Sequence, residues 1–413
     1  MLPEKWKEYL DKPLWPNRLA YYLIIFIAVL SVFGIVILIF ESLFSDFSIL
    51  SNTAYNQYNT TQLSDMGFFD NERYLLSALV QSLAAVIALV ITLSLVAVQL
   101  AAQSYSARVI DVYKQNPDMW ILLGIYILTI FYGLGLIKII GLGILSNYME
   151  GAIFGAYFMG FFAFICLVPY MWKTLELLKP STVIKLLAND ITPEKIIEVN
   201  RKEEQIYEID PVQPIMDIIY IALEKNDNET VKNGLYAIKN ATVDLLKNTK
   251  FKIFEEWEAT THIIQHIENI GLQAANRGNE YSMKFALMSL EYIGTESIIH
   301  KRYDSSVAVS HSIFSLYQHA QDKKMKLFIL KTIGSLENMG SEAAKQKEEE
   351  IIERISEILR VIGEKSIDEK HKNAVKMSST SLKRIGIKAE NRKLMHALEK
   401  IREDQNKLSN LYQ

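Results

Sequence analysis

The stretch 73-RYLLSALVQSLAAVIALVITLSLVAVQLAAQSYSAR-108 decides how this chain is organised. From Tyr74 to Ala102 no residue carries a charge. A helix of about 20 apolar residues is enough to cross a bilayer core of about 30 Å. This stretch is longer, so it predicts a helix that spans a membrane and projects beyond it. We therefore expect an integral membrane protein.

Small and polar side chains follow one face of this predicted helix, at steps of three or four residues or their multiples, with one leucine among them. These positions, here called the polar stripe, are Ser77, Gln81, Ala85, Ala88, Thr92, Leu95, Gln99, Gln103 and Ser106. Polar side chains are costly against lipid, so the stripe must face protein or water. Two interpretations are open: the stripe lines a water-filled path in a homo-oligomer, or it packs tightly against another helix.

Hydropathy predicts four membrane spans, at about residues 19–40, 74–102, 120–145 and 151–172. Lysine and arginine occur in the amino-terminal tail, after the second span and after the fourth, whereas residues 41–72 contain neither. Because cytoplasmic loops are enriched in these two residues, both termini are expected in the cytoplasm. The chain is thus predicted to be a multi-pass protein of the plasma or inner membrane, in contact with the lipid bilayer.

The predicted outer loop, residues 41–73, is acidic next to the second span. Asp65, Asp70 and Glu72 lie there. One interpretation is a vestibule that attracts cations to the mouth of a pore. The other is an ordinary solvated loop, because acidic residues are only weakly constrained by the rule that orients membrane spans.

The composition changes after Pro180: residues 181–210 predict linker helices, and residues 211–413 predict an all-helical cytoplasmic domain. In this domain an apolar-Gly pair recurs, flanked by an apolar residue and by Ala or Ser, at intervals of 23 or 46 residues. The glycines are Gly271, Gly294, Gly340, Gly363 and Gly386, with Tyr317 at the place of a missing member. We expect antiparallel helices stacked as in an α-solenoid, with glycines where helices cross closely. An irregular helical bundle with a chance period is the alternative.

Composition and motifs argue against several functions. The formal net charge of -3 gives no electrostatic reason to expect a nucleic-acid partner. With Cys166 as the single cysteine, neither a disulfide within the chain nor a cysteine-based metal site is possible. The sequence contains no phosphate-binding glycine loop and no nucleophile elbow. We therefore expect no enzyme and no cofactor.

Glu258, His262 and His266 are spaced by four residues, which places them on one face of a helix. This arrangement is compatible with a divalent metal ion. The alternative is three solvated polar side chains, which the sequence favours because nothing else converges on them. We therefore predict no metal site.

The stretch Gln99–Arg108, QLAAQSYSAR, resembles a family of prokaryotic predicted membrane proteins catalogued as domain of unknown function 2254. The family tends to end this stretch in Ser-Pro-Arg, and Ala107 replaces the proline here. Residues 123–126 (LGIY) and 129–132 (TIFY) resemble the family's next span, and residues 217–223 (DIIYIAL) are a weaker echo. The resemblance covers about half of the chain. It implies four spans, a soluble carboxyl-terminal part and no established activity.

Together these features predict a homo-oligomeric ion channel lined by the second span, with Leu95 as a hydrophobic constriction. Its cytoplasmic helices would respond to a protein or a small-molecule regulator. The alternative function is a membrane-tethered scaffold or sensor whose helical repeats bind a partner protein, without a pore.

Overall fold

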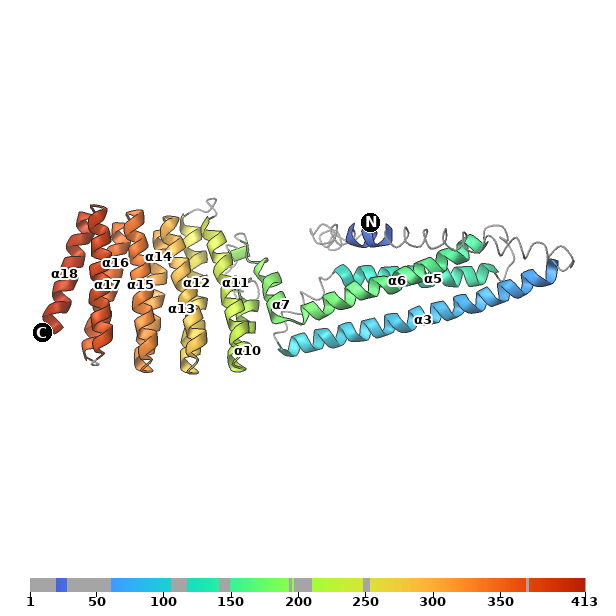
Figure 1. Ribbon diagram of the computed structural model, residues 1–413, viewed down its shortest axis with the longest axis horizontal. Coiled ribbons are helices and arrows are strands. Elements are labelled where there is room, and N and C mark those ends of the chain that lie inside the picture. Colours follow the sequence, from blue (N-terminus) through green and yellow to red (C-terminus); the bar gives the residue numbers. More distant parts are fainter. Residues whose placement is uncertain are drawn as a thin grey trace, which may run out of the picture. The chain divides into compact units, whose positions relative to one another are not determined.

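The computed structural model describes residues 20–27, 61–104, 117–140, 149–192, 195–196, 210–247, 253–368 and 371–412. All regular secondary structure within these ranges is helical (Figure 1), so the all-α class is confirmed for them. The chain divides into two compact units. The amino-terminal unit comprises Met1–Gln103 and Ile110–Lys179, and the other unit, the carboxyl-terminal unit, comprises Pro180–Gln413 together with Ser104–Val109.

Among the described residues, three helices of the amino-terminal unit are long and apolar enough to cross a membrane. They are α3 (Thr61–Ser104), α5 (Pro117–Ile140) and α6 (Met149–Leu177), and they coincide with the second, third and fourth predicted spans. Of the first predicted span, 19–40, only helical residues 20–27 are among those described. The count of four spans therefore stays a prediction.

Within the predicted outer loop, 41–73, residues from Thr61 onward are helical, because α3 already begins there. Hydropathy locates the apolar part of a helix, whereas the backbone can continue its hydrogen bonds into a polar medium. No proline interrupts residues 61–73, and the single Gly67 costs the helix only about 1 kcal/mol. The rest of the predicted loop lies outside the described residues.

These three candidate membrane helices pack through one apolar face of α3. Leu83 and Val90 of α3 share a core with Tyr126 of α5 and Cys166 of α6. Close approach requires small residues: a Cβ added at Gly133 of α5 would lie 2.6 Å from Val80, and one at Gly160 of α6 would lie 2.9 Å from Leu79. Gly133 and Gly160 thus lie where neighbouring helices approach closely, as small residues do in membrane helix contacts.

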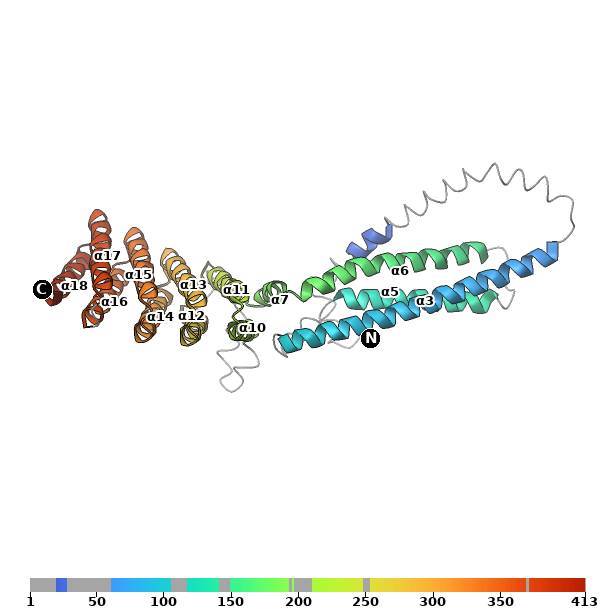
Figure 2. The same ribbon diagram turned by 60° about the horizontal axis from the view of Figure 1, so that its bottom comes forward.

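The carboxyl-terminal unit is a series of antiparallel helices in two layers. They are α7 (Pro180–Ala188), α10 (Gln213–Glu224), α11 (Asn228–Lys247), α12 (Ile253–Asn276), α13 (Glu280–Ile299), α14 (Tyr303–Asp322), α15 (Lys326–Gln346), α16 (Glu349–Asp368), α17 (Lys372–Asn391) and α18 (Met395–Tyr412). From α10 onward each helix packs against the next one and the next but one (Figure 2). The even-numbered helices thus form one layer, and α11, α13, α15 and α17 form the other. Part of the predicted linker joins this unit, because α7 packs against α10 and α11.

The recurring glycines mark where next-but-one helices touch. A Cβ at any of four of them would lie between 2.5 and 2.7 Å from a side chain 45 residues further along the chain. The pairs are Gly271–Leu316, Gly294–Met339, Gly340–Ile385 and Gly363–Leu408. At the position without glycine, the Tyr317 hydroxyl of α14 instead donates a hydrogen bond to the Ile362 carbonyl of α16, 3.2 Å away. The expected close crossing at the glycines is therefore confirmed for these pairs.

A turn of one kind follows most of these helices. Its left-handed residue has a positive φ, and in five turns this residue is Gly278, Lys301, Lys324, Lys347 or Lys393. The next N–H donates to the carbonyl of the Ala or Ser that ends the repeated pattern, as from Arg302 to Ser297 at 2.8 Å. These are the hydrogen bonds of a Schellman turn. One repeated pattern therefore supplies both the helix contact and the turn.

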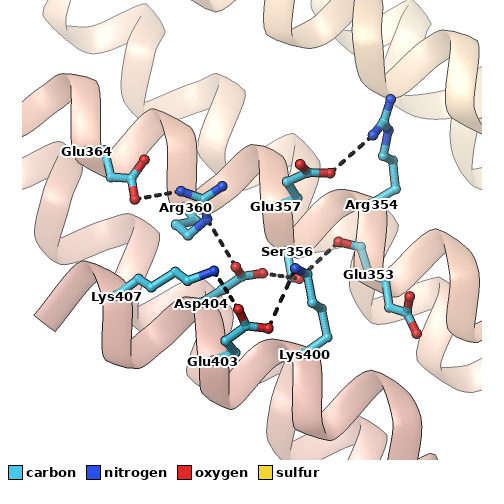
Figure 3. Close-up of polar contacts among 10 residues, drawn as sticks. All are labelled: Glu353, Arg354, Ser356, Glu357, Arg360, Glu364, Lys400, Glu403, Asp404 and Lys407. Atoms are coloured by element: carbon cyan, nitrogen blue, oxygen red, sulfur yellow. Dashed lines mark hydrogen bonds and ion pairs between the residues drawn. The ribbon is translucent and has the colours of Figure 1, made fainter.

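The last helix is tied to α16 by a buried ion pair (Figure 3). Arg360 Nε lies 3.0 Å from Oδ1 of Asp404, whose side chain is fully buried. The approach is close enough for an ion pair, although it is not a well-aligned hydrogen bond. The Ser356 hydroxyl donates to Oδ2 of Asp404 at 2.8 Å, and Arg360 also pairs with Glu364 at 2.6 Å. Without Arg360, the Asp404 carboxylate would keep only the neutral Ser356 hydroxyl as a hydrogen-bond donor.

Gly340→Ala is expected to lower the stability of the carboxyl-terminal unit. Its Cβ would meet Ile385 at 2.6 Å and Ile355 at 3.3 Å, and such overpacking costs about 1–3 kcal/mol. The gain in helix propensity offsets about 1 kcal/mol of this. Gly334→Ala, in the same helix, is the control, because its nearest atom, in Met377, is 3.6 Å away. Thermal unfolding of the detergent-solubilised chain should give a lower midpoint for Gly340→Ala and an equal or higher one for Gly334→Ala. An unchanged or higher midpoint for Gly340→Ala would contradict the close contact.

Arg360→Leu is expected to destabilise the chain by about 3 kcal/mol, because it leaves the Asp404 carboxylate buried without its cation. Arg402→Leu is the matched control, since Arg402 and Glu390 form an exposed pair at 3.8 Å. Its loss should cost less than about 1 kcal/mol. Urea unfolding followed by circular dichroism measures both values. Equal losses would show that the buried pair has no special role.

Candidate functional site

The polar stripe lies on the side of α3 that α5 and α6 leave uncovered. The buried residues of this helix include Leu76, Leu83 and Val90, which face the other two helices. Six stripe residues are exposed and Ser77 is half-buried, among those whose side chains are described. The exposed members are Gln81, Ala85, Ala88, Thr92, Leu95 and Gln99. Ser106 and the side chain of Gln103 lie outside the described residues.

Hydrogen bonds along α3 satisfy only part of the bonding capacity of the stripe. The Gln81 amide donates to the Ser77 hydroxyl at 3.2 Å, and the Thr92 hydroxyl donates to the Ala88 carbonyl at 2.8 Å. A carboxamide has two donors and an acceptor oxygen, and a hydroxyl also accepts. Gln81 and Thr92 therefore keep groups that can bond to water, to an ion or to another helix.

Leu95, a member of the polar stripe, also borders an apolar groove. Its side chain is 58% exposed. It lines a groove of about 340 Å³ between α3 and α5, together with Ile91, Trp120 and Leu123. The Leu95 side chain can therefore face either a helix or water that contacts the polar stripe, or the apolar groove.

The three predicted vestibule residues all belong to α3 rather than to a loop. Asp70 is exposed, and the side chain of Asp65 lies outside the described residues. Glu72 accepts a hydrogen bond from the Tyr157 hydroxyl of α6, at 2.6 Å. Glu72 therefore helps to hold α3 against α6, and the vestibule stays a prediction.

A second polar cluster lies in the carboxyl-terminal unit. Asp210, just before α10, brings Oδ2 to 3.0 Å from Nε2 of both His262 and His266 on α12. Burial raises the pKa of the Asp210 carboxyl, but the hydrogen bonds from the two histidines and the Val212 N–H outweigh it. The resulting pKa is well below the ordinary value, so Asp210 is a carboxylate at neutral pH. The spacing along α12 predicted Glu258 as the neighbour of the two histidines, but its side chain lies outside the described residues. Asp210, which does contact them, was not predicted.

A family model described as a predicted membrane protein, domain of unknown function 2254, matches residues 18–287. This match covers well over half of the chain. The chain belongs to this family. The predicted resemblance is thereby confirmed. The DUF2254 match extends from the candidate membrane helices into α13 and includes the three residues of the Asp210 cluster. No curated protein matches the chain.

Proposed function

We propose that this DUF2254 protein is a homo-oligomeric ion channel whose path is lined by α3. The observation that carries the proposal is the exposure of Gln81, Thr92 and Gln99 along an otherwise apolar spanning helix. Polar groups left in hydrocarbon without partners cost several kcal/mol each. A second copy of the chain offers the same polar stripe, and symmetric assembly would bring the stripes together.

The side chains of the stripe favour a water-filled path between copies of α3 over direct helix packing. Glutamine and threonine oxygens can replace part of the hydration shell of an ion, as the oxygens of selectivity filters do. A ring of Leu95 side chains would close such a path by dewetting. The competing arrangement is a dry helix contact, which Ala85 and Ala88 would permit by letting two backbones approach.

In this proposal both termini and the carboxyl-terminal unit are cytoplasmic, because cations alternate with the predicted loops. The stacked helices would then receive the regulatory signal, from a protein or from a small molecule. Their length and repeated packing support such a role, since helical repeats present extended surfaces for binding.

One observation favours the alternative of a scaffold that binds a partner protein. Four large side chains lie along one face of α13 and are each at least 40% exposed. They are Tyr281, Met288, Tyr292 and Ile299. Aromatic residues and methionine are enriched at protein interfaces. Lys239 of α11 lies over the Tyr292 ring, 4.3 Å from its centroid, and adds a charge beside this apolar face.

The first test concerns assembly. In a Cys166→Ala background, Gln81→Cys and Ala88→Cys are expected to form disulfide-linked dimers when native membranes are oxidised, because the stripes of two copies meet. Leu83→Cys is the control, since Leu83 is fully buried within one chain. Gel electrophoresis without reductant reads out the dimers. If both stripe variants stay monomeric, or cross-link no better than Leu83→Cys, the proposed assembly through the polar stripe is contradicted.

The second test concerns conduction. Purified chain in planar bilayers should carry unitary currents, and Leu95→Ser should raise the open probability at least about twofold by wetting the constriction. Leu93→Ser is the control, because Leu93 is also exposed but lies on another face of α3. No current for any cation tested, or equal effects of both substitutions, would contradict the proposed channel. The scaffold would then be the remaining proposal.

A further inference from the structure

The Asp210 cluster has a geometry that hydrogen bonding alone does not explain. Three atoms, Asp210 Oδ2, His262 Nε2 and His266 Nε2, lie 3.0 Å from one another in every pair. Each neutral imidazole nitrogen carries at most one hydrogen. Two hydrogens can serve two of the three contacts, so at least one contact joins atoms with no hydrogen directed between them.

A metal ion accounts for all three contacts at once. Zinc binds histidine nitrogen and carboxylate oxygen at about 2.0–2.2 Å. In a tetrahedral site with such bonds, the ligand atoms lie roughly 3.3 Å apart, close to the spacing found here. We propose that Asp210, His262 and His266 bind a divalent transition-metal ion of the zinc class.

The surroundings hold these three ligands in place. His262 and His266 lie one turn apart on α12, with ring centroids 4.4 Å apart and the rings nearly perpendicular. Oδ1 of Asp210 accepts a hydrogen bond from the Val212 N–H at 2.8 Å, which leaves Oδ2 for the histidines. Backbone donors of this kind orient metal-binding carboxylates.

Burial and charge also suit a cation. The side chain of Asp210 is 4% exposed, that of His266 is 15% exposed and that of His262 is 27% exposed. A single carboxylate with two neutral imidazoles offers one negative charge to a divalent ion. The partial exposure of His262 gives access from solvent, and a water molecule or a further side chain can complete the coordination.

The ligand set distinguishes among metals. Two nitrogens and one oxygen match zinc and its first-row neighbours, whereas calcium and magnesium prefer oxygen ligands throughout. Such an ion would join the residue that precedes α10 to the middle of α12. It would therefore fasten the start of the two-layered stack, and it does not depend on whether α3 lines a pore.

The test is a Zn²⁺ titration of the full chain in detergent, purified with an affinity tag that contains no histidine and stripped with a chelator. Wild type should bind one Zn²⁺ per chain with a dissociation constant below about 1 μM. Asp210→Asn and His266→Gln should each weaken binding at least about 100-fold, since outer-sphere changes alone cost 10- to 100-fold. His319→Gln is the matched control, because His319 contacts Asn276 outside the cluster. Absence of micromolar binding, or equal binding by all variants, overturns the site.

A measurement on the unaltered chain covers the case in which a variant does not fold. Diethyl pyrocarbonate modifies accessible imidazoles, and peptide mass spectrometry locates the product. Zn²⁺ at one equivalent should reduce modification of His262 at least about fivefold and leave His319 unchanged, because a nitrogen that binds metal has no free lone pair. Equal modification of His262 with and without Zn²⁺ overturns the proposal.

Discussion

Lipid tails offer no hydrogen-bond partners to polar side chains. The polar face of α3 must therefore contact protein or water and not lipid. The helix buries an apolar face against α5 and α6 and leaves Gln81, Thr92 and Gln99 exposed among the described residues. Hydrogen bonds along α3, such as that from Gln81 to Ser77, reduce the cost but do not use all donors and acceptors. In the proposed function, a second copy of the chain covers this face and a hydrated axis satisfies its remaining donors and acceptors.

In the carboxyl-terminal unit, one repeated sequence pattern provides both the contact between next-but-one helices and the turn that ends each helix. A glycine such as Gly340 accepts Ile385 from the next helix of its own layer. One turn later, the Ala343 carbonyl accepts the N–H of Glu348 and ends the helix. Because both contacts belong to the same repeated pattern, each new hairpin meets the previous one in the same register. The buried pair of Arg360 and Asp404 then joins the last helix to α16.

Much of this architecture could be predicted from the sequence, because strong periodic signals carry it. Long apolar runs predicted the three candidate membrane helices, and the glycine interval predicted close contacts between helices. The start of α3 at Thr61 was missed, because hydropathy ignores a polar extension of a helix. The turn residues with a positive φ, such as Lys347, could not be predicted, because lysine has no particular preference for this conformation. Asp210 was missed for a related reason: it lies 52 residues before His262, and only the packing of α10 on α12 brings them together.

The central claim is that water wets the polar stripe in the membrane. A single-cysteine scan of residues 77–99, in a Cys166→Ala background, tests it with a water-soluble, membrane-impermeant thiol reagent. The account predicts reaction at Gln81, Ala88 and Thr92 and none at Leu89 or Leu93, which lie on other exposed faces of the helix. Stripe positions that react no faster than Leu89 and Leu93 would contradict it, and the polar stripe would then be a dry helix contact.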